Sequence, residues 1–271
     1  MEHRVILFFA LVAAGLWGAA VKNDRAEEIV QRSVQNINSD WAAAPRYDFK
    51  ERDVITKGGT RSANTYEVLM IDGSPYKKMI AANGRPLSVV QASAEERKLQ
   101  QEIARRRKET PSARQKRVSE YQRERRQDNA LLREMAQAFN YKLAGEETVN
   151  GRRCFVVDAT PRPGYMPKTR DTKVLTGMRG KMWIDEQQYQ WVRVHAEVFR
   201  PVAFGLFIAH VKPGTAFTLE QQPMDGNLWL PSHFSMTLKE EILILSRQSK
   251  DDETYSEYRP AGQEAAVTKA R

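Results

Sequence analysis

The sequence predicts an α+β protein built on one wide antiparallel sheet, and three features of the 271-residue chain support this. Short segments of alternating apolar and polar residues follow one another from Gly180 to Tyr258, with turns between them. A period of two is typical of half-buried strands, and strands joined by turns form an antiparallel meander. Two stretches of helical character complete the chain, one near the N-terminus and one inserted between two groups of strands.

The alternation in the meander also predicts which side chains share a face. We expect four apolar residues of one strand to lie together, opposite Arg193, His195 and Glu197; they are Val192, Val194, Ala196 and Val198. The acidic run 251–253 lies between two predicted strands, and we expect it to form a charged turn.

The first twenty residues have the pattern of a secretory signal peptide. Arg4 precedes the apolar run Val5 to Gly18, and Gly18-Ala19-Ala20 offers small residues for cleavage. The alternative is a membrane anchor, but the run is shorter than the roughly 20 apolar residues that span a bilayer. We therefore expect residues 1–20 to be removed and the protein to be exported to the periplasm or secreted.

The mature chain is expected to begin with a helix and three strands. Asp24, with Glu27 three residues later, predicts a helix start, and Pro45 predicts the end. An apolar stripe of helical period runs between them: Val30, Val34, Ile37 and Trp41. The strands are expected at about 46–56, 62–72 and 75–81, separated by Gly58-Gly59 and by the hairpin signal Asp72-Gly73.

A helical pair is predicted at about 93–140, before the sheet resumes near Arg153. Ser93 and Glu96 form a candidate capping box, and Thr110-Pro111 predicts a break between the two helices. The second helix ends in an apolar edge that is the candidate lid or plug: Leu131, Leu132, Met135 and Phe139.

The net charge of +9 is concentrated in this insert, where residues 95–134 hold thirteen Lys and Arg against eight Asp and Glu. Mixed signs and one aromatic residue, Tyr121, indicate solvated helices and exclude a nucleic-acid surface, which concentrates positive charge with interleaved aromatics. In an exported protein, an anionic membrane surface is the better counterpart for this charge.

Residues that carry catalytic chemistry are scarce. Cys154 lies in an apolar string and predicts a buried, inert thiol. The mature chain contains His195, His210 and His233, none of them in a metal-binding spacing. We found no nucleophile elbow and no phosphate-binding loop, so we expect no catalytic residue, no metal and no cofactor.

Large apolar side chains are abundant in the meander. Each can simply fill a core, but a sheet this wide has more inner face than one helix can cover, so several can instead line a cavity. The candidates for such a ligand cavity are Trp183, Trp191, Phe204, Phe207, Phe217, Trp229, Phe234 and Met236.

The order of elements, together with the segments Tyr66–Tyr76 and Gly180–Asp185, resembles the LolA/LolB lipoprotein-carrier superfamily, which includes RseB-type sensors and exported outer-membrane lipoprotein-sorting proteins. The resemblance implies one half-barrel domain over residues 21–259, formed as an unclosed β-barrel around helices. Residues 260–271 lack periodicity, and we expect them to form a disordered tail. The carriers use an Arg on an early strand to hold the lid closed; Lys77 and Lys78 lie near that region here.

Two functions are compatible with this resemblance. The first is a monomeric periplasmic carrier that shields the acyl chains of a lipid or lipoprotein in an apolar cavity, without chemistry. The alternative is an envelope sensor or protein-interaction module that uses the charged helical insert as its contact surface. A hollow barrel favours the first function, and a filled barrel favours the second.

Overall fold

The computed structural model describes residues 13–169, 171–204, 209–242 and 245–262. Side chains are described from residue 24 onwards, apart from those of 128, 130–132, 171, 204 and 209. Three α-helices and two short 3-10 helices are present in this part of the chain: α1 (Ala13–Ala43), η1 (Ala44–Arg46), α2 (Val89–Arg107), α3 (Pro111–Ala138) and η2 (Asp171–Gly177).

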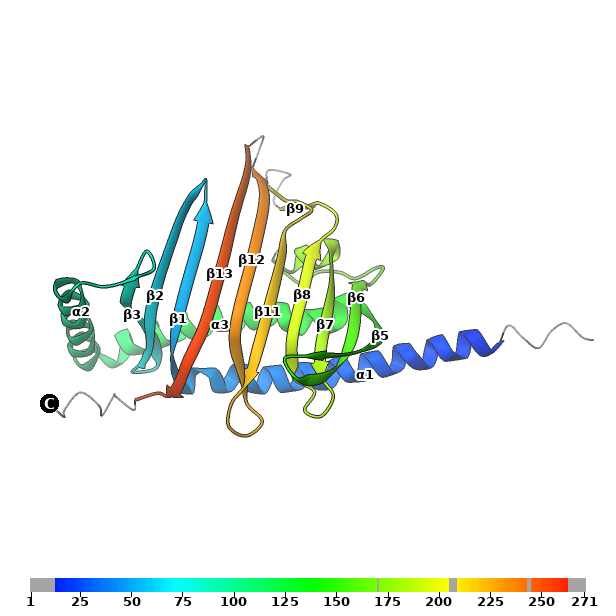
Figure 1. Cartoon of the computed structure of the whole chain (residues 1–271), viewed down its shortest axis with the longest axis horizontal. Helices are drawn as coiled ribbons and strands as arrows, with labels where there is room; N and C mark the ends of the chain where they lie inside the picture. The colour runs from blue at the N-terminus through cyan, green and yellow to red at the C-terminus, as the bar shows by residue number, and fades with distance from the viewer. Residues whose placement is uncertain (1–12, 170, 205–208, 243–244, 263–271) are drawn as a thin grey trace, which may run out of the picture.

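Thirteen strands within the described ranges form one antiparallel sheet (Figure 1). They are β1 (Tyr47–Lys57), β2 (Thr60–Ile71), β3 (Ser74–Ala82), β4 (Arg85–Pro86), β5 (Phe139–Val149), β6 (Arg152–Pro161), β7 (Met178–Asp185), β8 (Trp191–Val198), β9 (Val202–Phe204), β10 (Ala209–Val211), β11 (Ala216–Pro223), β12 (Trp229–Ile242) and β13 (Leu245–Pro260). Their order across the sheet is β4-β3-β2-β1-β13-β12-β11-β8-β7-β6-β5, and β9 and β10 form a side hairpin on β12.

The last long strand pairs with the first. β13 lies between β12 and β1, so the N-terminal strands and the meander form one continuous surface. Strands β4 and β5 lie at opposite ends of this order, and the sheet stays open (Figure 1). The prediction of an α+β fold with an unclosed, wide antiparallel sheet is confirmed.

Helix α1 packs its apolar stripe onto the sheet as the sequence predicts. Val30 and Ile37 are buried, and Val34 packs against the same core. Trp41 is half-buried, and the Arg125 guanidinium lies 5.0 Å from its ring centre. The helix begins at Ala13 and not at Asp24, because the preceding residues include several alanines and no proline. Residues 1–12 of the expected signal peptide lie outside the described residues, as does most of the expected tail.

The helical insert starts earlier than predicted. Ser88 and Gln91 form the capping box of α2, so the predicted box of Ser93 and Glu96 is wrong. The break at Thr110 is confirmed, since its hydroxyl caps α3 by accepting from the Ala113 backbone N–H. A capping box satisfies otherwise unpaired backbone N–H groups, so the pair Ser88 and Gln91, which comes first in the chain, sets the start of the helix.

Two further strand predictions need correction. Helix α3 ends at Ala138, and Phe139 begins β5. This strand was not predicted, because residues 135–140 were assigned to the helix. The acidic run 251–253 is not a turn but lies in the middle of β13, where it pairs with β1 on one side and β12 on the other. The ladder hydrogen bonds from both neighbours outweigh the low strand propensity of Asp.

Apolar residues gather on both faces of one part of the sheet. The larger cluster joins α1 and α3 to one face of β5 to β8, which we call the helix face; its strand members include Val157, Met182, Ile184, Trp191 and Val194. A smaller cluster lies on the opposite, outer face: Val149, Cys154, Val192 and Trp229, with Trp183 against it.

Candidate functional site

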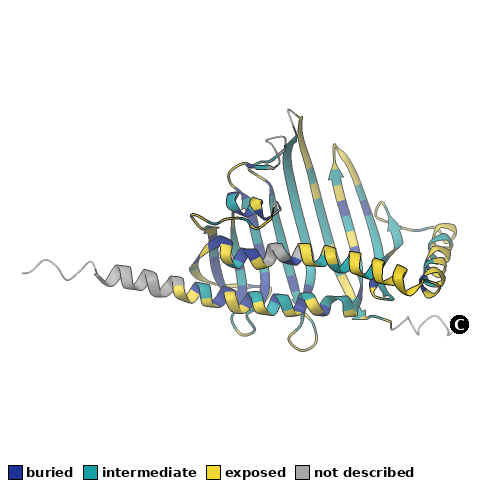
Figure 2. Ribbon diagram, turned by 180° about the vertical axis from the view of Figure 1, so that it is seen from behind, coloured by how far each residue is buried: buried dark blue, intermediate teal, exposed yellow. Residues whose placement is uncertain are grey.

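The sheet has two halves that differ in how they are covered. We call β5 to β8 the packed half, because α1 and α3 bury its helix face. We call β1 to β3, β12 and β13 the open half. Figure 2 shows α1 and α3 crossing near one end of these long strands and leaving most of their length without a helix above it. After its first two residues, β12 has only half-buried residues to its end at Ile242.

An apolar patch lies where the two halves meet, on the helix face. It consists of Phe217, Phe234 and Met236, all half-buried. Phe217 is directly opposite Met236 in the ladder, and its ring is stacked 6.4 Å from that of Phe234. Phe217 also packs against the large core, so the patch continues the core onto the open half. Three of the eight cavity candidates are thus brought together.

Beyond the patch, the helix face of the open half becomes polar. Glu253 of β13 lies opposite Phe234 of β12, and Asp53 of β1 lies opposite Glu253. The two strands next to the patch therefore carry carboxylates on the same face. The Tyr255 hydroxyl donates to Glu253, and Lys77 forms an ion pair with the buried carboxylate of Glu51. We call these five residues the polar strip.

In the polar strip, the pKa values of two carboxyl groups are raised, which favours their neutral forms. Burial raises the pKa of Glu253, and the nearby charges of Glu51 and Asp53 raise it further. Burial likewise raises the pKa of Asp53, with Glu51 contributing in the same direction and Lys77 opposing it. One oxygen of Asp53 is buried and has no hydrogen-bond partner among the described residues. A surface that is apolar on one side and polar on the other suits an amphipathic ligand.

The other predicted cavity residues lie elsewhere. Trp191 is in the packed core, 1% exposed, and its indole N–H donates to Ser33 of α1. Trp183 and Trp229 belong to the cluster on the outer face, where their indole N–H groups donate to Glu147 and Gln188. Phe207 lies outside the described residues, as does the side chain of Phe204.

The predicted lid residues contribute to the packed half. Met135 of α3 and Phe139 of β5 are both buried in the large core. The side chains of Leu131 and Leu132 lie outside the described part of the structure. The Tyr141 hydroxyl donates to the Met135 carbonyl at 2.7 Å, which joins the end of α3 to the following strand.

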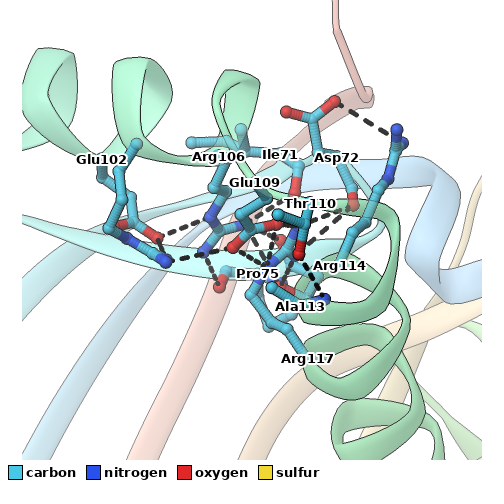
Figure 3. A network of polar contacts seen from close by, with 12 residues as sticks. Ile71, Asp72, Pro75, Glu102, Arg106, Glu109, Thr110, Ala113, Arg114 and Arg117 are labelled. Atoms are coloured by element: carbon cyan, nitrogen blue, oxygen red, sulfur yellow. Dashed lines mark hydrogen bonds and ion pairs between the residues drawn. The ribbon is translucent and has the colours of Figure 1, made fainter.

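The insert is attached to the β2–β3 hairpin by two arginines (Figure 3). Arg106 of α2 is 6% exposed and donates to the backbone carbonyls of Ile71 and Ser74. Its charge is balanced by Glu102 at 2.6 Å. Arg117 of α3 donates to the Ser74 hydroxyl at 2.7 Å and pairs with Glu109. Because both arginines bind the same hairpin, the two helices are fixed at their junction.

A lysine fixes the other part of α2 to the sheet edge. Lys78 of β3 pairs with Glu96 of α2 at 2.6 Å, with 19% of the lysine side chain exposed. The hydrogen bonds from Lys78 and Gln100 lower the pKa of Glu96. Lys77 and Lys78 therefore have separate partners, one in the polar strip and one in the insert.

One further buried carboxyl lies near the C-terminal end of α1. Asp40 is 5% exposed, and one of its oxygens has no hydrogen-bond partner among the described residues. Burial raises its pKa to about 6, while the Trp229 backbone and the Gln190 side chain act to lower it. The sequence did not point to Asp40, because its position on the helix gives no sign that Gln190, just before β8, and Trp229, the first residue of β12, lie next to it.

The residues with catalytic potential are held in structural roles. Cys154 is fully buried, as predicted, and burial raises the pKa of its thiol to about 11. His195 contacts the Thr218 hydroxyl at 3.0 Å, and His233 contacts Asp252 at 3.0 Å. Among the described residues, no group of three or more His, Cys, Asp or Glu side chains could hold a metal ion. No helix in the described ranges is long and apolar enough to cross a membrane.

The comparisons with known proteins give structural neighbours only. No family model and no curated protein matches the chain. Three crystal structures are similar to it. A DUF1329 family protein from Desulfovibrio piger has 11% identity and a TM-score of 0.35, covering 90% of this chain and 95% of its own. A domain described as outer membrane lipoprotein-sorting, from Vibrio parahaemolyticus, has 10% identity and a TM-score of 0.34, covering 88% and 95%.

A LolA superfamily protein from Nitrosomonas europaea has 9% identity and a TM-score of 0.31, covering 87% of this chain and 93% of its own. The chain is similar to LolA-like proteins. The names of the second and third neighbours match the group that the sequence resembles.

Proposed function

We propose that this chain is an exported envelope protein that binds the acyl chains of a lipid or lipoprotein on the helix face of its open half, and carries them without chemistry. The observation that carries the proposal is the half-buried apolar patch of Phe217, Phe234 and Met236 on the helix face, at the border of the open half. The signal-peptide pattern and the resemblance of the sequence to lipoprotein carriers support the compartment and the ligand class.

The position of the ligand follows from the packing. Trp191, Met135 and Phe139 fill the space between the helices and the packed half, so a chain would lie on the open half instead. Each buried methylene contributes about 0.8 kcal/mol, so an acyl chain gains useful affinity even if only part of its length is buried against the protein. The polar strip next to the patch would then face the head group or the polar end of the ligand.

The deciding experiment is identification of lipids that copurify with the full chain, by solvent extraction and mass spectrometry. We expect acyl-containing lipids in the parent protein and their loss from a variant with Phe234→Asp and Met236→Asp. The control is Trp183→Asp, which adds one negative charge on the outer face, against two in the variant, and is expected to retain the lipid. A parent protein that carries no lipid and binds no fluorescent fatty acid would contradict the proposal.

A further inference from the structure

Helix α2 has an outward face without a single acidic residue. Its exposed residues include Arg97, Lys98, Arg105 and Arg107, and the exposed Lys108 follows directly. The three glutamates of the helix are all less exposed and are all engaged. Glu95 pairs with Lys98, Glu96 pairs with Lys78 of the sheet edge, and Glu102 pairs with Arg105 and Arg106.

Three of the outward cations have no counter-charge on the protein. Within the described residues, no carboxylate forms an ion pair with Arg97, Arg107 or Lys108. By contrast, Arg105 is shared between Glu102 and Glu109. The helix therefore directs its negative charge toward the protein and its unbalanced positive charge toward solvent.

The same face begins with two exposed apolar side chains. Val89 and Val90 are 83% and 77% exposed on the first turn of α2. The capping box of Ser88 and Gln91 fixes this turn, so the valines are held outward by a formed helix. Exposed apolar residues next to basic ones are typical of helices that lie at a membrane interface.

We propose that the outward face of α2 docks on an anionic lipid bilayer, with Val89 and Val90 entering the head-group region and Arg97, Arg107 and Lys108 contacting the lipid phosphates. Each basic residue near such a surface contributes about 1 kcal/mol, which requires cations that are not already paired. A soluble acidic partner would satisfy the charges but gives no reason for two valines at the tip. A bilayer interface accounts for both features.

This inference is independent of the lipid cargo. The surface lies on α2 at the β3 edge, whereas the apolar patch lies on β11 and β12. Loss of copurifying lipid would leave vesicle binding intact, and loss of vesicle binding would leave the cargo site intact. The two proposals can therefore fail separately.

The test is cosedimentation of the full chain with vesicles. Phosphatidylglycerol mixed with phosphatidylethanolamine provides the anionic surface, and phosphatidylcholine alone measures charge-independent binding, including any from the N-terminal apolar segment. We expect binding to the anionic vesicles above this baseline, decreasing with added salt because exposed charges are screened.

Two variants locate the contact. Arg97→Gln with Arg107→Gln and Lys108→Gln should weaken anionic binding by about 100-fold. Val89→Ser with Val90→Ser should weaken it by about tenfold. The matched control is Leu245→Ser with Arg247→Gln, which removes an exposed apolar residue and an exposed cation from the β12–β13 end of the sheet. This control should bind like the parent.

Equal binding to both vesicle types would overturn the proposal, as would α2 variants that bind like the parent. Binding to soluble polyglutamate without binding to vesicles would also overturn it, because the partner would then be an acidic protein. Circular dichroism of each variant checks that the fold is retained, which the exposure of all seven substituted residues favours.

Discussion

The packed and open halves of the sheet use the same antiparallel ladders but differ in what their helix faces carry. In the packed half, residues such as Val157, Met182 and Val194 are buried under α1 and α3. In the open half, the corresponding positions hold Glu51, Asp53 and Glu253 next to a small apolar patch. The helices therefore cover the strands whose helix-face residues are apolar, because the burial of apolar side chains is favourable.

The contrast also predicts that the two halves contribute unequally to stability. The packed half buries most of the core, whereas the open half carries half-buried apolar and ionisable groups, where we propose that the ligand binds. Four substitutions test this division, from the largest expected effect to the smallest.

Trp191→Ala should have the largest effect. The side chain is 1% exposed among α1 and the packed strands, and it donates to the Ser33 hydroxyl. Removing it leaves a cavity, while the Ser33 hydroxyl loses the indole donor and keeps its own bond to the Val30 carbonyl. We expect the free energy of unfolding to fall by about 4 kcal/mol. Urea denaturation measures this, with Trp183→Ala on the outer face as a milder control. A smaller loss for Trp191 than for Trp183 would contradict the assignment of the core.

Arg106→Ala should detach the insert from the open half. The substitution leaves the carbonyls of Ile71 and Ser74 without this donor, and Glu102 keeps only Arg105 as its partner. We expect a loss of about 3 kcal/mol and earlier proteolytic cleavage of the insert than of the sheet. Arg107→Ala removes the neighbouring exposed arginine and should change stability little. Equal protease resistance in the two variants would show that the insert is held by other contacts.

Asp40→Asn should stabilise the protein, and only at neutral pH. Because the pKa in the folded state is raised from 3.8 to about 6, the unfolded chain ionises first, and Asp40 reduces stability as pH rises between these values. Asn removes the charge, so we expect a gain of about 2 kcal/mol at neutral pH and almost none near pH 4. Melting temperatures at the two pH values measure the difference. An equal effect at both would mean that ionisation is not the cause.

Phe234→Ala should have the smallest effect on stability. Its side chain is half-buried and lies on the open half, so little apolar surface returns to water and no closed cavity forms. We expect a loss of about 1 kcal/mol in the free energy of unfolding. Comparison with Trp191→Ala gives the sharpest contrast between the halves. A loss as large as that of Trp191 would show that the open half is also a core.

Local patterns predicted most of the helices and strands. The stripe of Val30, Val34 and Ile37 identified the buried side of α1, because side chains four residues apart lie on one side of a helix. Asp72-Gly73 identified the β2–β3 hairpin, since both residues adopt positive φ there, 46° and 90°. β5 was missed because Met135 and Phe139 are four residues apart and fit a helix as well as the start of a strand.

The faces of the strands were harder to predict. A register shift in the β7–β8 ladder, between Trp183 and Ile184, sends Val192 to the outer face, while Val194, Ala196 and Val198 remain in the large core. A one-residue irregularity of this kind exchanges the two faces and leaves no local sequence signal.

The polar strip could not be predicted for a related reason. Glu51 and Lys77 lie on β1 and β3, which are not adjacent, and Glu253 comes from the far end of the chain. Their proximity depends on the register of several ladders at once. The three residues of the apolar patch are all among the eight cavity candidates, but the sequence did not show that Phe217 of β11 lies beside Phe234 and Met236 of β12.

The pairing of β1 with β13 sets the order in which the molecule can assemble. Lys57 meets Ser249 and Asp48 meets Arg259, so the central ladder joins residues separated by most of the chain. Contacts of such long sequence separation make folding slow, because the intervening loop must close first. Until β13 arrives, one edge of β1 is a row of unpaired backbone groups that invites association with other chains. Pairing of β13 with β1, and not local helix formation, is therefore the step after which this sheet can become whole.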